Sequence, residues 1–544
     1  MRSIVRRWGE LLSTLALSAV PFVAAAATDV TGTWVARQAS PMGEMEFVFR
    51  LKGDAKGALS GSVTTPFNDG PILGGSVRDT VITLSIETEF FGDLQRRTVT
   101  GRIVGDQLQF ESAALMPSAP PGPPGVPGAG GGGGPALGAG PPPMNLPQTL
   151  IARRGTPAPS FKAGPVDYKT LPQVELPALR IVPENGLAMT PPMGWNTWNK
   201  FHTQVDDKTI RGIADAMVAS GMRDAGYAYI NIDDGWEGRR DSNGVLQPNA
   251  NFPDMKALAD YVHSKGLKLG LYSSPGPRTC GGFEGSHGHE EIDARTWASW
   301  GIDYLKYDWC TASRVWKNED MRAVYQRMGE AIRATGRPMI YSLCQYGIAG
   351  VESWGPLVGG NLWRTTGDIF DSWAAMLQNI TAQDALAGSA APGRWNDPDM
   401  LEVGNGGMTA TEYRTHFSLW AMAAAPLIAG NDVRELDADT RDILLNKEVI
   451  AVDQDPSGQQ GRRVAQQGTM EIWLRSLGHG AYALAAVNRG DAQAEVTLQW
   501  ADLGLPAGLG ARDLWLHRDL GRLADGYQSL IAGHGVLMLR LQRD

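Results

Sequence analysis

The chain has 544 residues, of which 43% are hydrophobic and 20% are charged, and its formal net charge is −9. A chain of this length is too long for one hydrophobic core, so we expect roughly two to four domains of ordinary globular composition. The negative charge and the lack of a long basic run argue against nucleic acid and anionic membranes as main partners.

The N-terminus has the order of a secretory signal peptide. Three arginines precede a mostly apolar run from Leu11 to Val23, and four alanines follow at 24–27. The apolar run is too short to span a bilayer comfortably, and no later stretch approaches a membrane-spanning length. We therefore predict a signal peptide over residues 1–27 and a mature protein that is secreted or periplasmic, with no membrane segment.

The next part of the chain predicts a small β domain. From Val30 to Glu111, short runs of alternating hydrophobic and polar residues are separated by Gly/Asp turns, which indicates a barrel or sandwich of about six to eight strands. The Pro/Gly-rich stretch 117–147 is expected to be disordered or extended, as a linker or as a loop inside this domain. The strand-like QTLIARRG after it favours the loop. The prediction is a β-rich accessory domain over 28–155 and a linker over 156–187.

Strand-like runs then alternate with helical patterns from Ala188 to about Val452. One predicted helix places four apolar side chains on a single face, with Gly221 as its C-cap: Ile210, Ile213, Ala214 and Met217. Alternation over about 260 residues predicts a (β/α)8 TIM barrel at 188–453. An open doubly wound sheet is the alternative, but no G-x-G-x-x-G follows the first strand. The β-rich remainder predicts a C-terminal antiparallel β-sandwich at 454–544.

In such a barrel the active site forms at the carboxyl ends of the strands. Those ends collect carboxylates, aromatic residues and two cations: Asp233, Asp234, Tyr272, Lys306, Asp308, Gln345, Tyr346, Arg364, Asp368, Asp397 and Asp399. Paired carboxylates beside aromatic platforms indicate glycoside hydrolysis, in which one carboxylate attacks or activates water and one acid protonates the leaving oxygen. This chemistry needs no cofactor, and no P-loop or H-E-x-x-H motif suggests one.

Seven motifs occur in order along this region: TPPMGWNTWNKF (190–201), NIDDGW (231–236), GLYSSPGPRTC (270–280), YLKYDWC (304–310), YSLCQYG (341–347), WRTTGDIFDSW (363–373) and WNDPDML (395–401). Together they resemble glycoside hydrolase family 27, the melibiase-like family of α-galactosidases and α-N-acetylgalactosaminidases. The resemblance covers about 188–540 and leaves out the N-terminal β domain. It implies a (β/α)8 barrel followed by an antiparallel β domain. It also implies an exo-glycosidase that releases terminal α-D-galactosyl residues by double displacement with retention. Separately, we expect the protein to be a monomer or homodimer.

The resemblance implies a role for each matching residue. Asp308 would be the nucleophile and Asp368 the acid/base, while Asp233 and Asp234 would hold the O4 and O6 hydroxyls of galactose. Four further side chains would contact the substrate or the nucleophile: Trp198, Tyr272, Lys306 and Arg364. Lys306 lies two residues before Asp308 on one strand face, so its charge should lower the pKa of that carboxyl.

The three cysteines of the chain are Cys280, Cys310 and Cys344. Export makes one disulfide possible and leaves one thiol over, and the lack of a Cys-x-x-Cys pair and of clustered histidines argues against structural zinc. The resemblance implies that Cys280 and Cys310 form a disulfide beside the pocket and that Cys344 is free.

Two adjacent positions depart from the family pattern. Many members have Glu-Trp where this chain has Gln345 and Tyr346, in the loop that reads the 2-position of the sugar. An amide can donate or accept a hydrogen bond, so the choice between a 2-hydroxyl and a 2-acetamido group stays open. Asp233 and Asp234 favour a sugar with an O6 hydroxyl, which speaks against a β-L-arabinopyranosidase.

Other interpretations remain beside the catalytic one. Asp308 and Lys306 could be a structural ion pair, and the protein could bind carbohydrate without catalysis, with the N-terminal β domain as its active part. Asp371, Asp397 and Asp399 are better explained as loop supports. The His287-Gly-His289-Glu290 segment is better explained as a helix start than as a metal site, since acidic residues suit the positive end of the helix dipole. Three tryptophans of the C-terminal part are expected in its core: Trp473, Trp500 and Trp515.

Overall fold

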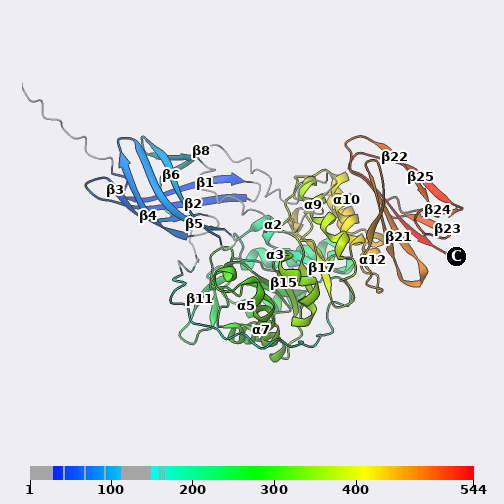
Figure 1. Ribbon diagram of the computed structural model, residues 1–544, viewed down its shortest axis with the longest axis horizontal. Coiled ribbons are helices and arrows are strands. Elements are labelled where there is room, and N and C mark those ends of the chain that lie inside the picture. The colour runs from blue at the N-terminus through cyan, green and yellow to red at the C-terminus, as the bar shows by residue number, and fades with distance from the viewer. Residues whose placement is uncertain are drawn as a thin grey trace, which may run out of the picture.

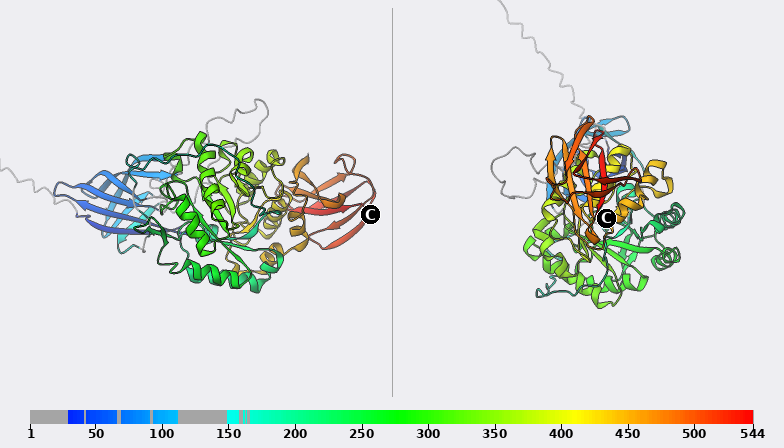
Figure 2. Two further views of the ribbon diagram at one scale, coloured as in Figure 1. Left: turned by 90° about the horizontal axis from the view of Figure 1, so that it is seen from below. Right: turned by 90° about the vertical axis from the view of Figure 1, so that its right-hand side faces the viewer.

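The computed structural model describes residues 29–40, 43–65, 69–90, 93–111, 149–157, 161, 163 and 166–543. The predicted signal peptide and the predicted disordered stretch 117–147 lie outside these residues. Three parts follow one another along the molecule: an N-terminal barrel, a central barrel with surrounding helices, and a C-terminal β domain (Figures 1 and 2). Among the helices described, none is both long enough and apolar enough to cross a membrane.

The N-terminal domain is a closed antiparallel barrel, in agreement with the predicted all-β class. Its strands are β1 (Gly32–Ser40), β2 (Gly43–Gly53), β3 (Ala58–Thr64), β4 (Asp69–Arg78), β5 (Val81–Phe90), β6 (Asp93–Val104), β7 (Gln107–Glu111) and β8 (Thr149–Arg154). β8 pairs with both β7 and β1, so the chain between β7 and β8 connects two strands of one barrel. Alternation places Leu108, Phe110, Leu150 and Ala152 inside, where they bury apolar surface.

The central domain contains an eight-stranded parallel sheet in the order β17-β16-β15-β14-β13-β10-β9-β18. The strands are β9 (Met193–Asn196), β10 (Tyr229–Asn231), β13 (Lys268–Ser273), β14 (Tyr304–Asp308), β15 (Ile340–Cys344), β16 (Leu362–Arg364), β17 (Trp395–Asp397) and β18 (Leu427–Ala429). A parallel bridge joins Leu401, which follows β17, to Ala429, so the two edges of the sheet meet. This is the predicted TIM-barrel architecture.

The helices described in this domain are α2 (Trp198–Phe201), α3 (Asp207–Ser220), α4 (Met222–Ala225), α5 (Met255–Ser264), α6 (Glu290–Trp300), α7 (Met321–Ala334), α8 (Val351–Trp354), α9 (Trp373–Gln383), α10 (Ala410–Met422), α11 (Ala438–Leu444) and α12 (Lys447–Asp453). A hairpin of β11 (Glu237–Arg240) and β12 (Leu246–Pro248) follows β10. α3 buries the four predicted apolar side chains. Its N-cap is Asp206, whose side chain accepts a hydrogen bond from the Thr209 amide, and its C-cap is Gly221, with φ of 90°.

The C-terminal domain is antiparallel, as predicted. A six-stranded sheet contains β19 (Arg462–Gln467), β20 (Met470–Ser476), β21 (Tyr482–Asn488), β26 (Val536–Gln542), β23 (Leu509–Asp513) and β24 (Arg518–Leu523). A second sheet pairs β22 (Ala494–Gln499) with β25 (Gly526–Ile531). Trp473 and Trp500 are buried, and the Trp515 ring N–H donates to Ser418 of α10 at 2.9 Å. Trp500 therefore lies in the core of this domain as predicted, whereas Trp473 and Trp515 pack with the apolar cluster of the central barrel, so the prediction is wrong for these two.

The segment between the two barrels is bound to the central barrel along its described part. The Ala163 amide donates to the Gly282 carbonyl at 3.1 Å, close to the carboxyl ends of the strands. Farther along, the Gln326 side chain bonds both the Ala178 carbonyl, at 2.9 Å, and the Arg180 amide, at 3.0 Å. The segment is thus a strap along the barrel wall and not a free linker.

Candidate active site

Parallel strand register brings the predicted site residues to one edge of the barrel. β10, β13, β14, β15 and β16 are neighbours in the sheet, and register pairs Tyr272 with Lys306 and Asp308 with Cys344. Because parallel strands end on the same side, the residues at and just after their carboxyl ends converge.

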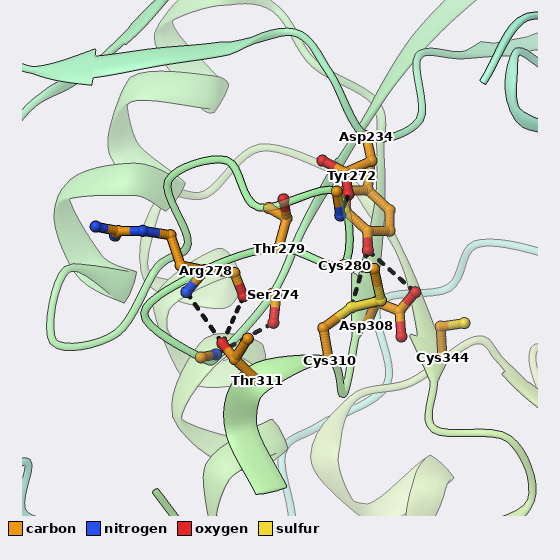
Figure 3. The surroundings of a disulfide bond; sticks show 12 residues. Asp234, Tyr272, Ser274, Arg278, Thr279, Cys280, Asp308, Cys310, Thr311 and Cys344 are labelled. Carbon is orange, nitrogen blue, oxygen red and sulfur yellow. Dashed lines mark hydrogen bonds between the residues drawn. A yellow bond between two sulfur atoms is a disulfide. The ribbon is translucent and has the colours of Figure 1, made fainter. Parts of the chain in front are cut away.

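Asp308, the last residue of β14, is 4% exposed and is held by two tyrosine hydroxyls. The Tyr272 hydroxyl donates to Oδ2 at 3.1 Å, and the Tyr346 hydroxyl donates to Oδ1 at 2.7 Å. Figure 3 shows Tyr272 pointing at both Asp308 and the neighbouring disulfide. Both carboxylate oxygens are therefore fixed in direction.

Lys306 does not form the direct ion pair with Asp308 that its position on the strand suggested. Its ammonium lies 2.8 Å from Oδ2 of Asp233, 73 residues away in the chain. Burial raises the pKa of Asp308 to about 6, and the lowering effect of Lys306 only partly offsets this. Lys306 therefore acts on Asp308 as expected in sign, but burial decides the net shift.

Asp233 and Asp234 follow β10 and have different surroundings. The Asn196 amide group and Lys306 both bond Oδ2 of Asp233 at 2.8 Å. Asp234 accepts the backbone amide of Gly281 on Oδ2, while its Oδ1 is buried without a partner among the described groups. Burial raises the pKa of Asp234 to about 7, against the lowering effects of hydrogen bonds from the Gly281 N–H and the Thr279 side chain. The unpaired Oδ1 is suited to accept a hydrogen bond from a sugar hydroxyl.

Arg364, at the end of β16, holds two carboxylates at once. Its Nη2 donates to Oδ1 of Asp368 at 2.9 Å, and its Nη1 lies 3.1 Å from Oδ1 of Asp399. The Arg364 side chain is 2% exposed, whereas that of Asp368 is 33% exposed. Asp368 is therefore tied to the barrel by a buried cation and is still partly exposed to solvent.

The other carboxylates of this region support loops. Asp399, with φ of 87°, accepts the Ile369 amide on Oδ2 at 2.7 Å and so fixes the residue after Asp368. Asp397 accepts the Asp399 amide at 2.9 Å, and Asp371 accepts the Tyr413 hydroxyl at 2.8 Å. These contacts agree with the expectation that the three residues act as supports.

A disulfide joins Cys280 and Cys310, and Cys344 is buried and free. The bridge links the loops after β13 and β14 beside Asp308 (Figure 3). In the described part of the chain, one set of side chains lies close enough together to share a metal ion, namely Cys280, Cys310 and Asp308. Because the two sulfurs are bonded to each other, they offer no thiolate ligand to such an ion.

The two remaining predicted residues, Trp198 and Gln345, differ in burial. Trp198 is half-buried at the start of α2. Its ring packs edge-on against the His202 ring, with the two ring centroids 5.3 Å apart. Gln345 is completely buried, and its Oε1 accepts the Gly347 amide at 3.2 Å. Its Nε2 has no partner among the described groups. Its expected contact with the sugar 2-position stays a prediction.

Two contacts were not predicted from the sequence. Asn196, the last residue of β9, bonds Asp233, and its place at a strand end was a usable signal. Tyr346 bonds Asp308 through a backbone with φ of 62°. The residue pattern does not predict that left-handed backbone conformation, because it is uncommon for residues other than glycine.

Comparison with known proteins identifies the family to which the chain belongs. The family model described as alpha galactosidase A matches residues 190–455, and the alpha galactosidase C-terminal beta sandwich domain matches 467–541. An α-galactosidase of Coffea arabica is 52% identical over 339 residues, which cover 61% of this chain and 88% of that protein. The chain belongs to the α-galactosidase family of glycoside hydrolases.

Further relatives of the α-galactosidase family cover the same region. The crystal structure of α-galactosidase I from Mortierella vinacea superimposes with a TM-score of 0.63 at 40% identity, covering 66% of this chain and 98% of that one. An α-N-acetylgalactosaminidase of Gallus gallus is 38% identical over 393 residues, which cover 65% of this chain and 94% of that protein. The chain is thus a glycoside hydrolase whose relatives include α-galactosidases and an α-N-acetylgalactosaminidase.

Proposed function

We propose that this protein is an exported, retaining exo-α-galactosidase that removes terminal α-D-galactosyl residues from oligo- or polysaccharides. The observation that carries the proposal is Asp308, a carboxylate oriented by two hydroxyls, on a strand next but one to Arg364 and its partner Asp368. The activities of the Coffea arabica and Mortierella vinacea relatives support the substrate class.

The first half-reaction forms a glycosyl ester. An oxygen of Asp308 attacks the anomeric carbon while the Asp368 carboxyl donates its proton to the glycosidic oxygen, so the aglycone leaves as a neutral alcohol. Tyr272 and Tyr346 hold the plane of the attacking carboxylate, which is the orientation effect that makes a bound reaction resemble an intramolecular one.

The second half-reaction hydrolyses the ester. The Asp368 carboxylate takes a proton from water as the water oxygen attacks the anomeric carbon, and Asp308 leaves as a carboxylate. Each of the two steps inverts the configuration of the anomeric carbon, so the product keeps the configuration of the substrate. For this mechanism we expect the Asp308 and Asp368 carboxyl groups to lie about 5–5.5 Å apart.

The sugar would be bound by polar groups that already lie at the strand ends. Asp233 and Asp234 would accept the O4 and O6 hydroxyls, Lys306 would bind near O3 and O4, and Arg364 near O2. The unpaired Oδ1 of Asp234 supports a hydroxyl donor at that place.

A 2-acetamido sugar is the alternative substrate. The Gallus gallus relative acts on such sugars, and the buried Gln345 side chain offers an Nε2 donor near the loop that reads the 2-position. The Arg364 guanidinium can donate to a 2-hydroxyl or to an acetamido carbonyl, so the substrate panel below is what separates the two sugars.

Export is part of the proposal. The N-terminal pattern of arginines, apolar residues and alanines supports a signal peptide, and the Cys280–Cys310 bridge supports an oxidising compartment. Fractionation should give a secreted or periplasmic product whose N-terminus lies near residue 28, and size-exclusion chromatography should give a monomer or homodimer.

A panel of three nitrophenyl glycosides tests the activity: the α-galactoside, the α-N-acetylgalactosaminide and the β-L-arabinopyranoside. We expect the highest kcat/KM for the α-galactoside, with α-galactose as the first product seen by proton NMR. Preferred turnover of either other substrate, or release of β-galactose, would refute the proposal. Binding of galactosides without any hydrolysis would favour the carbohydrate-binding alternative.

A further inference from the structure

We propose that Tyr346 is a positioning residue that keeps the nucleophile Asp308 ionised and aimed. It closes a ring of contacts through Tyr272 and the Cys280–Cys310 disulfide. The inference rests on the proposed role of Asp308.

The ring is built from four side-chain contacts. The Tyr346 hydroxyl bonds Oδ1 of Asp308 at 2.7 Å, and the Tyr272 hydroxyl bonds Oδ2 at 3.1 Å. On the far side, the Tyr272 hydroxyl lies 3.2 Å from Sγ of Cys310, and the Tyr346 hydroxyl lies 3.7 Å from Sγ of Cys280. Each sulfur of the bridge thus supports one tyrosine, and each tyrosine holds one carboxylate oxygen.

The backbone at Tyr346 is held in a conformation that an aromatic residue adopts rarely. Its φ is 62°, and Gly347 follows with φ of 77°. The Gly347 amide donates to the Arg364 carbonyl at 3.0 Å, and a Cβ at Gly347 would lie 2.4 Å from the Thr365 carbonyl oxygen. The neighbouring loop therefore imposes the turn that points Tyr346 at Asp308. Strain of this kind persists where surrounding structure enforces it, often at a reacting group.

The groups around Asp308 are divided between those that favour its neutral acid and those that favour its anion, and the Tyr346 hydroxyl belongs to the second kind. Eight titratable groups act on the Asp308 carboxyl: Asp233, Asp234, Tyr272, Lys306, Tyr325, Cys344, Tyr346 and Asp368. Burial and the carboxylates Asp368 and Asp233 favour the neutral acid, whereas Lys306 and the Tyr346 hydrogen bond favour the anion. Since Lys306 is shared with Asp233, the Tyr346 hydroxyl is a donor directed at Asp308 itself.

Tyr346→Phe isolates the hydroxyl. It keeps the ring, whose centroid lies 5.7 Å from the Arg364 guanidinium carbon, and it keeps the backbone. A hydrogen bond to an ionised group lowers a carboxyl pKa, so its loss should move the acidic limb of the kcat/KM profile about one unit to higher pH. At pH values below that limb, kcat/KM should fall about tenfold. An unmoved limb in Tyr346→Phe would overturn the inference.

Tyr227→Phe is the matched control. Tyr227 is more deeply buried than the partly buried Tyr346, and its hydroxyl donates to the Leu444 carbonyl of α11 at 2.8 Å and not to Asp308. This variant should keep the acidic limb of the wild type. A similar shift in both variants would also contradict the inference, because it would show a general loss of packing.

A readout without substrate separates this inference from the proposed activity. Thermal unfolding of the wild type and of Tyr346→Phe should be compared between pH 4 and pH 8. Because the hydrogen bond stabilises the Asp308 anion, the difference in Tm should be small near pH 4 and grow as pH rises through about 6. A difference that is constant over this range would overturn the inference even if the enzyme prefers another sugar.

Discussion

Asp308 illustrates how burial and hydrogen bonding share control of one carboxyl group. The cation on its own strand, Lys306, forms its salt bridge with Asp233, and two tyrosine hydroxyls hold Asp308 instead. With a pKa near 6, Asp308 loses its charge as pH falls through that value. We therefore expect activity to fall on the acidic side of about pH 6, measured as kcat/KM against pH.

Alanine at the two proposed catalytic carboxylates should give different losses. Asp308→Ala should abolish turnover of every substrate, whereas Asp368→Ala should lose about 10²–10⁴-fold on an unactivated α-galactosyl disaccharide and much less on a nitrophenyl galactoside. The reason is that nitrophenolate leaves without protonation. Asp439→Ala, at an exposed position on α11, should behave as the wild type. Equal losses of Asp368→Ala on both substrates would contradict the acid/base assignment.

Glu237, buried beside Asp234, should make stability depend on pH. Burial, and then Asp234, raises the pKa of Glu237 well above its usual value. Its contribution to stability is therefore complete below the unfolded pKa and is lost as pH rises towards the folded one. Glu237→Gln cannot ionise, so its Tm should fall less between pH 5 and pH 8 than that of the wild type. Glu291→Gln, at an exposed position on α6, should show the wild-type slope.

At the scale of elements, loops and not strands carry the site. β13, β14 and β16 provide a register that the sequence predicts, but the fine geometry depends on the loop after each strand. Asp399 fixes the turn after Asp368 through the Ile369 amide, and the Cys280–Cys310 bridge joins the turns after β13 and β14. These crosslinks explain how short parallel strands hold side chains in a fixed arrangement.

Removal of the Cys280–Cys310 bridge should therefore affect both stability and catalysis. The two residues are 30 positions apart, and closing a loop of that length stabilises the folded state by about 3–4 kcal/mol in the chain-entropy model. Cys280→Ala with Cys310→Ala should lower Tm and also kcat, because Tyr272 and Tyr346 lose their support. A reductant should inactivate the wild type and leave the double variant unchanged. Full activity of the double variant would contradict this account.

At the scale of the whole molecule, the N-terminal barrel has a core of its own. Its buried side chains form one apolar cluster that is separate from the cluster of the central barrel. The strap between the barrels belongs instead to the central barrel through its bonds to Gly282 and Gln326. A domain boundary based on packing would therefore lie before the strap and not after it.

Two truncations test this boundary. A chain that begins at residue 161 should keep its activity on a nitrophenyl galactoside and a Tm close to that of the full chain. A chain that begins at residue 188 should unfold at a lower temperature, because it loses the backbone bonds of Ala178, Arg180 and Val182. Equal Tm values for the two truncations would show that the strap adds no stability.

The architecture could be predicted from the sequence, whereas several individual side-chain contacts could not. Alternation, helical periodicity and strand-end carboxylates are local signals, so the three folds and the positions of Asp308 and Asp368 could be predicted. The partner of Lys306 could not, because Asp233 is brought to it by the packing of strands and lies 73 residues away in the chain. The direction in which the Tyr346 side chain points depends on a backbone angle imposed by the neighbouring loop. The path of the strap depends on single hydrogen bonds to backbone carbonyls.

The closure of the N-terminal barrel has a consequence for the order in which the chain folds during synthesis. β1 lies next to β8, and this last pairing joins Trp34 to Arg154, which are 120 positions apart. Until Arg154 has left the ribosome, β1 and β7 each present an unpaired edge. The nascent barrel should therefore be most prone to pair with other chains in that interval, and most protected from proteases once β8 has inserted.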